Sequence, residues 1–304
     1  MAFSEIYTRQ VTLLIRVLPF VAEEPCFALK GGTAINLFIR DMPRLSVDID
    51  LAYLPLASHE DSLRDIDSAM SRIAARIRSG LRGAKVNETM LKENGAVYKL
   101  VVSLNGVQIL IEVTPVLRGC VFDGELKGVS AQVEEAYGFA EINTLSFADL
   151  YGGKIVAALD RQHPRDLFDI HELLANEGVN EKLREAFLVY LISHHRPMHE
   201  VLAPRLKDIG EEFERGFEGM TRDAVELSVL LDTRIQLISE VIGRMPPDHR
   251  NFLISFERGE PDWSLLNVEG VDKLPAVLWR MQNLSRLDST RRNQLVVSLE
   301  AALS

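Results

Sequence analysis

The sequence is short of cysteine and of long apolar runs, and each shortage excludes a class of protein. Only two of its 304 residues are cysteines, Cys26 and Cys120, which is too few for a disulfide framework. No apolar run approaches the roughly 18 residues that span a bilayer. Arg9 and Arg16 interrupt the apolar start of the chain, which is not typical of a signal peptide. We therefore expect a cytoplasmic protein with no membrane segment.

Basic residues are also in deficit, and one common nucleotide-binding motif is missing. The formal net charge is −10, whereas non-specific binding to nucleic acids depends on cations that neutralise phosphates. Any nucleic-acid site must therefore be local. The chain has no G-x-x-x-x-G-K-[ST] sequence, so the P-loop class is unsupported. Carboxylates gathered around divalent cations are compatible with an acidic chain.

The hydrophobic patterning changes along the chain and predicts an α+β fold. Helical periodicity at 3–22 and 59–79 is interspersed with strand patterns, and the "NG" pair at 105–106 is a strong hairpin signal. The strands are expected within residues 27–32, 45–53, 84–91, 96–104 and 107–116. The last three of these form an antiparallel meander.

From residue 146 onward the period is helical and no strand is expected. The predicted helices are 146–160, 164–176, 180–194, 221–244, 270–284 and 288–303. We therefore predict two domains: a mixed-sheet domain at 1–140 and an α-helical domain at 141–304.

Two acids share one face of the strand "LSVDIDLAY". Period 2 places Asp48 and Asp50 side by side, roughly 6–7 Å apart. A divalent cation such as Mg²⁺ or Mn²⁺ would remove their repulsion, and it prefers carboxylates together with substrate phosphates. Glu112, alone in the apolar strand "VQILIEVTPV", supplies a third acid. The alternative is that "DID" is the solvent face of an edge strand.

A glycine pair lies shortly before these acids. Gly31 and Gly32 end a strand and open a helix that we expect Thr33 to cap. The first N–H groups of such a helix form a natural cradle for phosphate. The alternative is a tight turn that needs glycine for its positive φ.

A second charged cluster lies in "LYGGKIVAALDRQHPRDLFDI". Lys154, Arg161 and Arg165 fall within twelve residues, directly before Asp166 and Asp169, and helical spacing can aim Lys154 and Arg161 the same way. This mixture suits a nucleotide, with lysine on phosphates and an acid on base or sugar or acting as a general base. Taken alone, "RDLFD" is also typical of an exposed, salt-bridged helix start.

The histidines of "SHHRPMHE" do not predict a metal centre. Pro197 breaks the helix that would align His194, His195 and His199, and no cysteine ligand accompanies them. We interpret this stretch as a surface loop or an RNA-facing rim.

Together, these motifs resemble a known signature. "GGTAINLF" followed by "DID", with a third acid on a later strand, resembles the polymerase-β-type nucleotidyltransferases. More narrowly, "LKGGTAINLFIRDMPRLSVDIDL" is similar to the AbiEii/AbiGii toxin group, in which an arginine such as Arg44 precedes the D-x-D. That group also carries a K…R…RDxxDL element, which is matched by Lys154, Arg161, Arg165, Asp166 and Asp169.

The resemblance implies transfer of a nucleoside monophosphate from an NTP to an acceptor, with loss of pyrophosphate. Asp48, Asp50 and Glu112 would hold Mg²⁺ or Mn²⁺. Asp166 is preferred over Asp169 as the essential late acid, although the sequence does not decide between them. The residues expected to bind the nucleotide are Gly31, Gly32, Thr33, Arg44, Lys154, Arg165 and Asp169.

The resemblance also implies partners. The helical domain would complete the nucleotide site and contact an RNA acceptor, with tRNA 3′ ends favoured, and a cognate antitoxin would accompany this bacterial toxin–antitoxin or phage-defence protein. Two alternatives stay open: an acceptor that is a protein or a small molecule, and a non-catalytic nucleotide-binding module.

Overall fold

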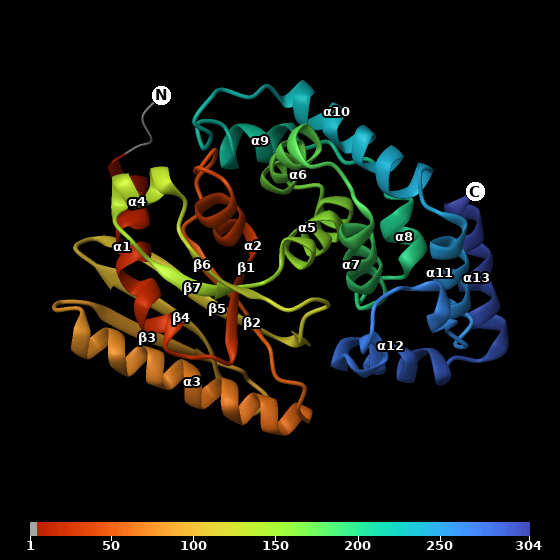
Figure 1. Ribbon diagram of the computed structural model, residues 1–304, viewed down its shortest axis with the longest axis horizontal. Helices are drawn as coiled ribbons and strands as arrows, with labels where there is room; N and C mark the ends of the chain where they lie inside the picture. Colours follow the sequence, from red (N-terminus) through yellow and green to blue (C-terminus); the bar gives the residue numbers. More distant parts are fainter. Residues whose placement is uncertain (1–4) are drawn as a thin grey trace. The chain divides into compact units, whose positions relative to one another are not determined.

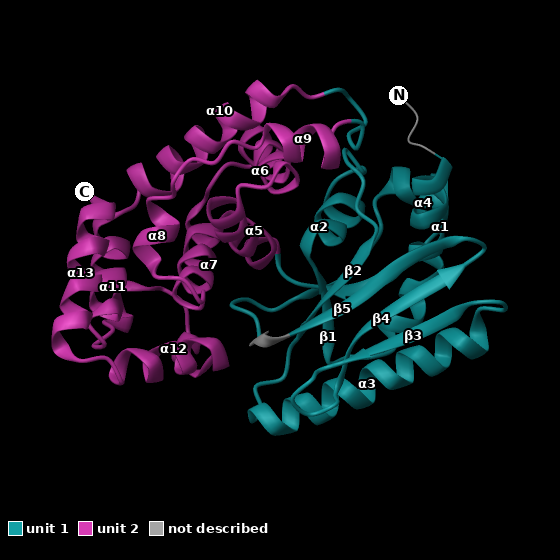
Figure 2. Ribbon diagram, turned by 180° about the vertical axis from the view of Figure 1, so that it is seen from behind, with its two compact units in different colours: residues 1–146, 219–224 teal, residues 147–218, 225–304 magenta. Residues whose placement is uncertain are grey.

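The computed structural model describes residues 5–304, without the side chains of residues 115–118. The chain divides into two compact units (Figure 2). The first comprises residues 1–146 and 219–224, and the second comprises residues 147–218 and 225–304.

A mixed sheet forms the centre of the first unit. Its seven strands follow the order β3-β4-β5-β2-β1-β7-β6. Their bounds are β1 Phe27–Lys30, β2 Asp48–Tyr53, β3 Lys85–Met90, β4 Val97–Leu104, β5 Val107–Arg118, β6 Glu125–Gly128 and β7 Glu141–Thr144. The pairs β2–β5 and β1–β7 are parallel, and the other neighbours are antiparallel. The predicted meander is confirmed as β3–β4–β5, and Asn105 and Gly106 adopt the positive φ of its tight turn.

Two long helices cover one face of this sheet. Helix α1 (Glu5–Ala22) packs against β5 and β7, helix α3 (His59–Gly80) packs against β3 and β4, and the two helices contact each other (Figure 1). Both helices lie where the sequence predicts them within the described residues. Alternation in the central strands gives an apolar row of Leu29, Leu51 and Val113, all fully buried. The residues that alternate with these three along each strand therefore form the other face.

The sheet extends past residue 140, where we expected it to end. Between β5 and the second unit lie β6, the short helix α4 (Ala131–Tyr137) and β7. None of these elements was predicted, because strands of four residues are too short to display a clear alternation. β7 pairs in parallel with β1, so the region up to Thr144 belongs to the sheet.

The segment 219–224 also belongs to the first unit, although we expected a helix from residue 221. Leu45 N donates to Met220 O at 2.9 Å, and Arg222 N donates to Pro43 O at 2.8 Å. These extended pairings hold the loop before β2, and helix α10 begins only at Leu227. The predicted start of this helix was therefore wrong.

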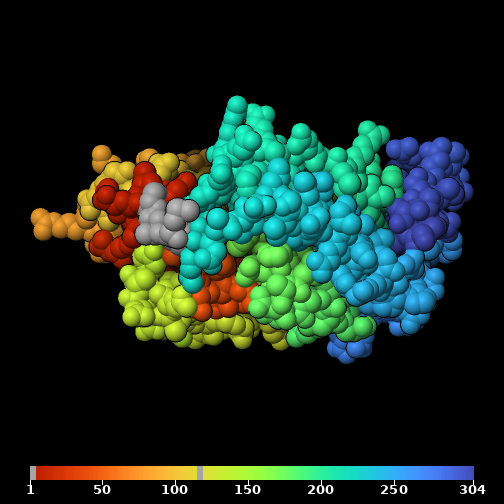
Figure 3. All heavy atoms as spheres, turned by 90° about the horizontal axis from the view of Figure 1, so that it is seen from above, coloured from red at the N-terminus to blue at the C-terminus, as the bar shows by residue number. Residues whose placement is uncertain are grey.

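The described residues of the second unit form helices joined by loops and contain no strand, as predicted. Its longer helices are α5 Phe147–Arg161, α6 Pro164–Asn176, α7 Glu181–Ile192, α10 Leu227–Ile238, α11 Pro247–Glu257, α12 Pro275–Ser285 and α13 Ser289–Leu303. Helices α11 and α13, coloured blue, pack together (Figures 1 and 3). No described helix is long and apolar enough to cross a membrane.

Three helices of this unit were missed, and one prediction began too early. Helices α8 (Met198–Leu202) and α9 (Gly210–Gly216) are too short to show a helical period, and α12 begins at Pro275, five residues after its predicted start. The third missed helix, α11, begins at Pro247. Proline is well suited to a first helical position because the missing N–H has no partner there.

Candidate functional site

Four charged residues form a row across four neighbouring strands of the first unit. The strand register places Lys30 opposite Asp50, Asp50 opposite Glu112, and Glu112 opposite Lys99. Residues directly opposite each other on adjacent strands share a face. Asp48 lies two residues before Asp50 and therefore shares that face as well. The sheet thus brings the three predicted acids to one face, although β2 begins at Asp48 and not at the expected Leu45.

The glycine turn lies against these acids. Gly31 follows β1 with φ of +75°, and a Cβ atom at this position would lie 2.6 Å from Asp50 Oδ2. A Cβ atom on Gly32 would lie 2.7 Å from Arg44 Nη2 and 2.9 Å from Ser46 Oγ. Gly31 therefore serves both a left-handed turn and the close approach of the Asp50 carboxylate.

Thr33 does not cap the helix, which corrects the prediction. The helix starts at Gly31 as α2 (Gly31–Thr33) and continues as a π-helical turn over Ala34–Ile39, so Thr33 lies inside it. Thr33 is fully buried, its Oγ1 lies 3.0 Å from Ser46 Oγ, and it donates to the carbonyl oxygen of Asp48. Its hydroxyl therefore ties the glycine turn to the start of β2.

Ser46 is the neighbour that sequence reasoning missed. It precedes Asp48 by two residues, and this spacing is the signal that could have marked it for attention.

The Arg44 side chain packs against the same glycine turn. Its side chain is only 3% exposed, and Nη1 donates to Leu45 O at 2.8 Å while Nη2 packs against Gly32. This placement accounts for an arginine shortly before the D-x-D. The nucleotide-binding role that the resemblance implies for Arg44 stays a prediction.

The acids have the right chemistry for a divalent cation, but they do not converge as three ligands. Carboxylates are the ligands that Mg²⁺ and Mn²⁺ prefer. In the described part of the chain, no three His, Cys, Asp or Glu side chains are grouped to hold a metal ion. Glu112 Oε2 instead lies 2.9 Å from Lys99 Nζ. This hydrogen bond, with the charges of Glu112 and Asp48, raises the pKa of Lys99.

A substitution at Gly31 tests the contact between the turn and Asp50. We expect Gly31→Ala to cost about 1–2 kcal/mol for its left-handed backbone, plus a further loss because the Cβ atom pushes the Asp50 carboxylate aside. Gly95→Ala is a matched control, since Gly95 has the same φ of +75° and nothing within 4 Å of its Cβ position. Urea unfolding of both variants measures the difference. Equal losses would show that Asp50 does not depend on this glycine.

The second cluster is a buried ion-pair network in the second unit. Lys154 Nζ lies 2.9 Å from Asp166 Oδ1 and 3.0 Å from Asp169 Oδ2, and Arg161 Nη2 lies 2.8 Å from Asp166 Oδ2. The Lys154, Asp166 and Asp169 side chains are 9%, 5% and 1% exposed. "RDLFD" is therefore not an exposed, salt-bridged helix start. The two cations balance the two carboxylates, as burial of charge requires.

Helices α5 and α6 hold this network in place. Lys154 lies on α5, and Asp166 and Asp169 are three residues apart on α6, which places them on one side of that helix. His163 caps α6, with Nδ1 accepting from Arg165 N at 3.1 Å. The exposed Arg165 side chain takes no part in the Lys154 pairs and donates to Gly216 O at 3.3 Å.

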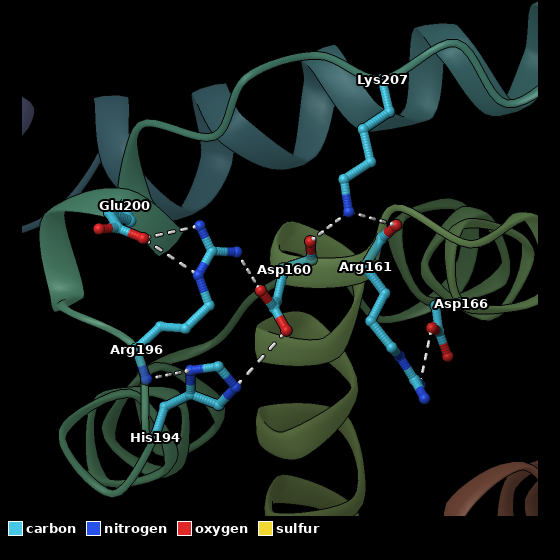
Figure 4. Close-up of polar contacts among 7 residues, drawn as sticks. All are labelled: Asp160, Arg161, Asp166, His194, Arg196, Glu200 and Lys207. Carbon is cyan, nitrogen blue, oxygen red and sulfur yellow. Dashed lines mark hydrogen bonds and ion pairs between the residues drawn. The ribbon is translucent and has the colours of Figure 1, made fainter.

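A polar network surrounds the end of α5 (Figure 4). Arg196 pairs with both Asp160 and Glu200, and Lys207 Nζ donates to the carbonyl oxygens of Asp160 and Arg161 at 3.1 and 3.3 Å. A pocket of about 760 Å³ is lined by these side chains, by His199 and by part of α13. Sequence reasoning missed it because its walls come from segments far apart in the chain.

The structure gives little support for a catalytic role of the cysteines or histidines. The cysteines form no disulfide, and burial, with the charges of Asp65 and Glu24, raises the pKa of the Cys26 thiol to about 12. Such a thiol is not a nucleophile at neutral pH. Burial, with the neighbouring His195 as a second cause, lowers the pKa of His194.

Comparisons with known proteins fit this arrangement. Over its full length the fold is similar to MenT4, a nucleotidyltransferase toxin from Mycobacterium tuberculosis H37Rv, with a TM-score of 0.59, 14% identity, and coverage of 98% of this chain and 95% of that one. A likeness to terminal uridylyl transferase 4 from Trypanosoma brucei with bound dUTP has 13% identity, coverage of 97% and 92%, and a TM-score of 0.29, which is too low to carry an argument.

A comparison with curated protein sequences gives no match. The family model described as "Nucleotidyl transferase AbiEii toxin, Type IV TA system" matches residues 12–281, which include all the predicted site residues. The chain therefore belongs to the AbiEii family of nucleotidyltransferase toxins.

Proposed function

We propose that this protein transfers a nucleoside monophosphate from an NTP to an acceptor hydroxyl. The acceptor oxygen attacks the α-phosphorus, the bond from that phosphorus to the bridging oxygen breaks, and pyrophosphate leaves. The observation that carries the proposal is the D-x-D of β2, which lies against the glycine turn at Gly31 and has Glu112 in register beside Asp50. The family membership supports the reaction class.

In this proposal the first unit provides the metal and phosphate contacts. Asp48 and Asp50 hold Mg²⁺ or Mn²⁺, and Glu112 joins them. The bound cation supplies charge neutralisation on the triphosphate. Backbone N–H groups of Gly31 and Gly32 face phosphate oxygens, because the first N–H groups of a helix lack partners within it. Thr33 contributes through its backbone, since its hydroxyl is already bonded to Ser46 and Asp48.

The roles of the second cluster, Lys154 with Asp166 and Asp169, are taken from the resemblance to the AbiEii group. Lys154 would neutralise charge as pyrophosphate leaves, and Asp166 or Asp169 would be the late acid. Both carboxylates already bind Lys154. A phosphate that contacts this ammonium must therefore share it with them.

We propose RNA as the acceptor, with tRNA 3′ ends first among candidates, and a cognate antitoxin as the protein partner. The toxin family supports this choice. Several arginines that would serve an RNA surface are paired with acids. These are Arg196 with Glu200, Arg215 with Glu211, Arg244 with Glu240, and Arg258 with Glu300. RNA bound through them must displace those partners. Because cations that neutralise phosphates release counterions from the RNA, we expect binding to weaken as salt is added.

One observation favours a second candidate, a nucleotide-binding module without catalysis. Adjacent carboxylates with no cation would destabilise a strand. Lys30 and Lys99 flank Asp50 and Glu112 in the row, so the acids are balanced even without a metal ion. Their presence alone therefore does not require catalysis.

The test is incorporation of label from each α-labelled NTP, with Mg²⁺, into total cellular RNA. We expect label in a tRNA-sized band with one preferred NTP. Label on protein or on a small molecule instead would replace the RNA acceptor. NTP binding without transfer to any acceptor would establish the non-catalytic module.

A further inference from the structure

Glu112 is held by a lysine from the neighbouring strand. Lys99 on β4 is directly opposite Glu112 on β5, and Nζ lies 2.9 Å from Oε2. Asp50 is opposite Glu112 on the other side, on β2. The Glu112 carboxylate therefore lies between an acid and a lysine, and it forms an ion pair with the lysine.

The pair is not needed to hold the sheet together. The Lys99 and Glu112 side chains are 27% and 42% exposed, and pairs of that exposure contribute little to stability. The backbone ladder between β4 and β5 begins at this pair and continues from Leu100 to Leu104. Lys99 can therefore be replaced without loss of the fold, and its role lies elsewhere.

A divalent cation and Lys99 would compete for the same carboxylate. Both are cations, and Glu112 is the third acid on this face of the sheet. The charge of Asp48 also acts on Lys99, so the ammonium lies within the field of the D-x-D as well as that of Glu112. Coulomb repulsion between an ammonium and a divalent cation on one carboxylate is substantial even with partial screening.

We propose that Lys99 is a positioning residue that holds Glu112 away from the D-x-D and releases it when a divalent cation binds. This inference rests on the proposed function. Once released, the ammonium of Lys99 remains on the face that carries Asp48 and Asp50, where the triphosphate provides it with a new anionic partner. Cation and NTP should therefore bind cooperatively, and Lys99 should carry part of the coupling.

Mn²⁺ alone, followed by calorimetry and electron paramagnetic resonance, is the first probe. Lys99→Met should bind Mn²⁺ about two- to fivefold more tightly than wild type, the factor that a pair of this exposure is worth. Glu112→Gln should bind it more weakly. The double variant should match Glu112→Gln, because Lys99 acts through Glu112. Lys127→Met is the control, since Lys127 pairs with Glu125 at 2.6 Å on β6 and is absent from the row.

The second probe measures coupling to the nucleotide. A non-hydrolysable NTP analogue should raise Mn²⁺ affinity more in wild type than in Lys99→Met, because only wild type has an ammonium to transfer from Glu112 to phosphate. Equal enhancement in both proteins would refute the transfer.

The outcomes separate this inference from the proposed function. If Asp50→Asn abolishes Mn²⁺ binding while Lys99→Met leaves it unchanged, Lys99 does not compete and only this inference fails. If neither wild type nor Lys99→Met binds Mn²⁺ with or without the analogue, the metal site of the proposed function fails as well. Tighter binding in Lys99→Met that persists in the double variant would also overturn the role of Glu112.

Discussion

Under the proposed function, in which Asp48 would hold the metal, replacing Asp48 by asparagine should lower nucleotidyl transfer on the order of 10³-fold, because such a ligand contributes several kcal/mol to the transition state. Stability should stay unchanged or rise. Asparagine fits the same space, and it removes repulsion from Asp50. The backbone carbonyl of Asp48 that accepts from Thr33 is unaffected. Transfer from the preferred NTP and thermal unfolding measure the two effects separately.

Asp123→Asn is the control for this substitution. Asp123 is an exposed aspartate of the first unit that lies outside the row, so we expect its loss to change neither activity nor stability. An Asp48→Asn protein that unfolds would show that the aspartate is structural. A stable Asp48→Asn protein with full activity would remove the metal role from the D-x-D.

The sequence was sufficient to predict the face on which the acids lie. Period 2 fixes Asp48 and Asp50 relative to each other, because the alternation of side chains along a strand depends on no other part of the chain. The meander could also be predicted from short stretches of sequence, since the glycines of its turns follow the hairpin pattern. The buried face at Leu51 follows from the same alternation.

Which residues lie opposite each other on neighbouring strands could not be predicted from the sequence. That Lys99 lies opposite Glu112 depends on register, and a shift by one residue would place every side chain on the other face. Thr33 was interpreted as a cap because its neighbours fit that pattern, but the left-handed Gly31 starts the helix two residues earlier. Segment 219–224 pairs with a loop more than 170 residues before it, and nothing in its own periodicity indicates this.

Burial of the second cluster was also not predictable. Lys154, Asp166 and Asp169 have the composition of an exposed helix face, and charged residues are rarely buried unless paired. Only the packing of α5 on α6 shows that each charge has a partner. The resemblance drew attention to these residues, but it gave no indication that they are buried.

Replacing Lys154 by methionine should lower the free energy of unfolding by about 3–5 kcal/mol, the cost of leaving a buried charge without its partner. Asp169, which is 1% exposed, would lose its ion pair with Lys154, whereas Asp166 would keep Arg161 at 2.8 Å. Urea unfolding measures the loss. Unchanged stability would show that the network does not hold the helices together.

A second substitution separates this stability from chemistry. In Lys154→Met/Asp169→Asn, Asp166 keeps Arg161 and the buried charges again cancel, so the double variant should regain about half or more of the lost stability. Asp169→Asn alone is the control, because Lys154 still pairs with Asp166. A folded double variant that binds NTP poorly would support Lys154 as a phosphate contact beyond its structural role. If it used NTP as well as wild type does, Lys154 would be structural only, and the late acid would have to be Asp166, since Asp169 would be absent from a working enzyme.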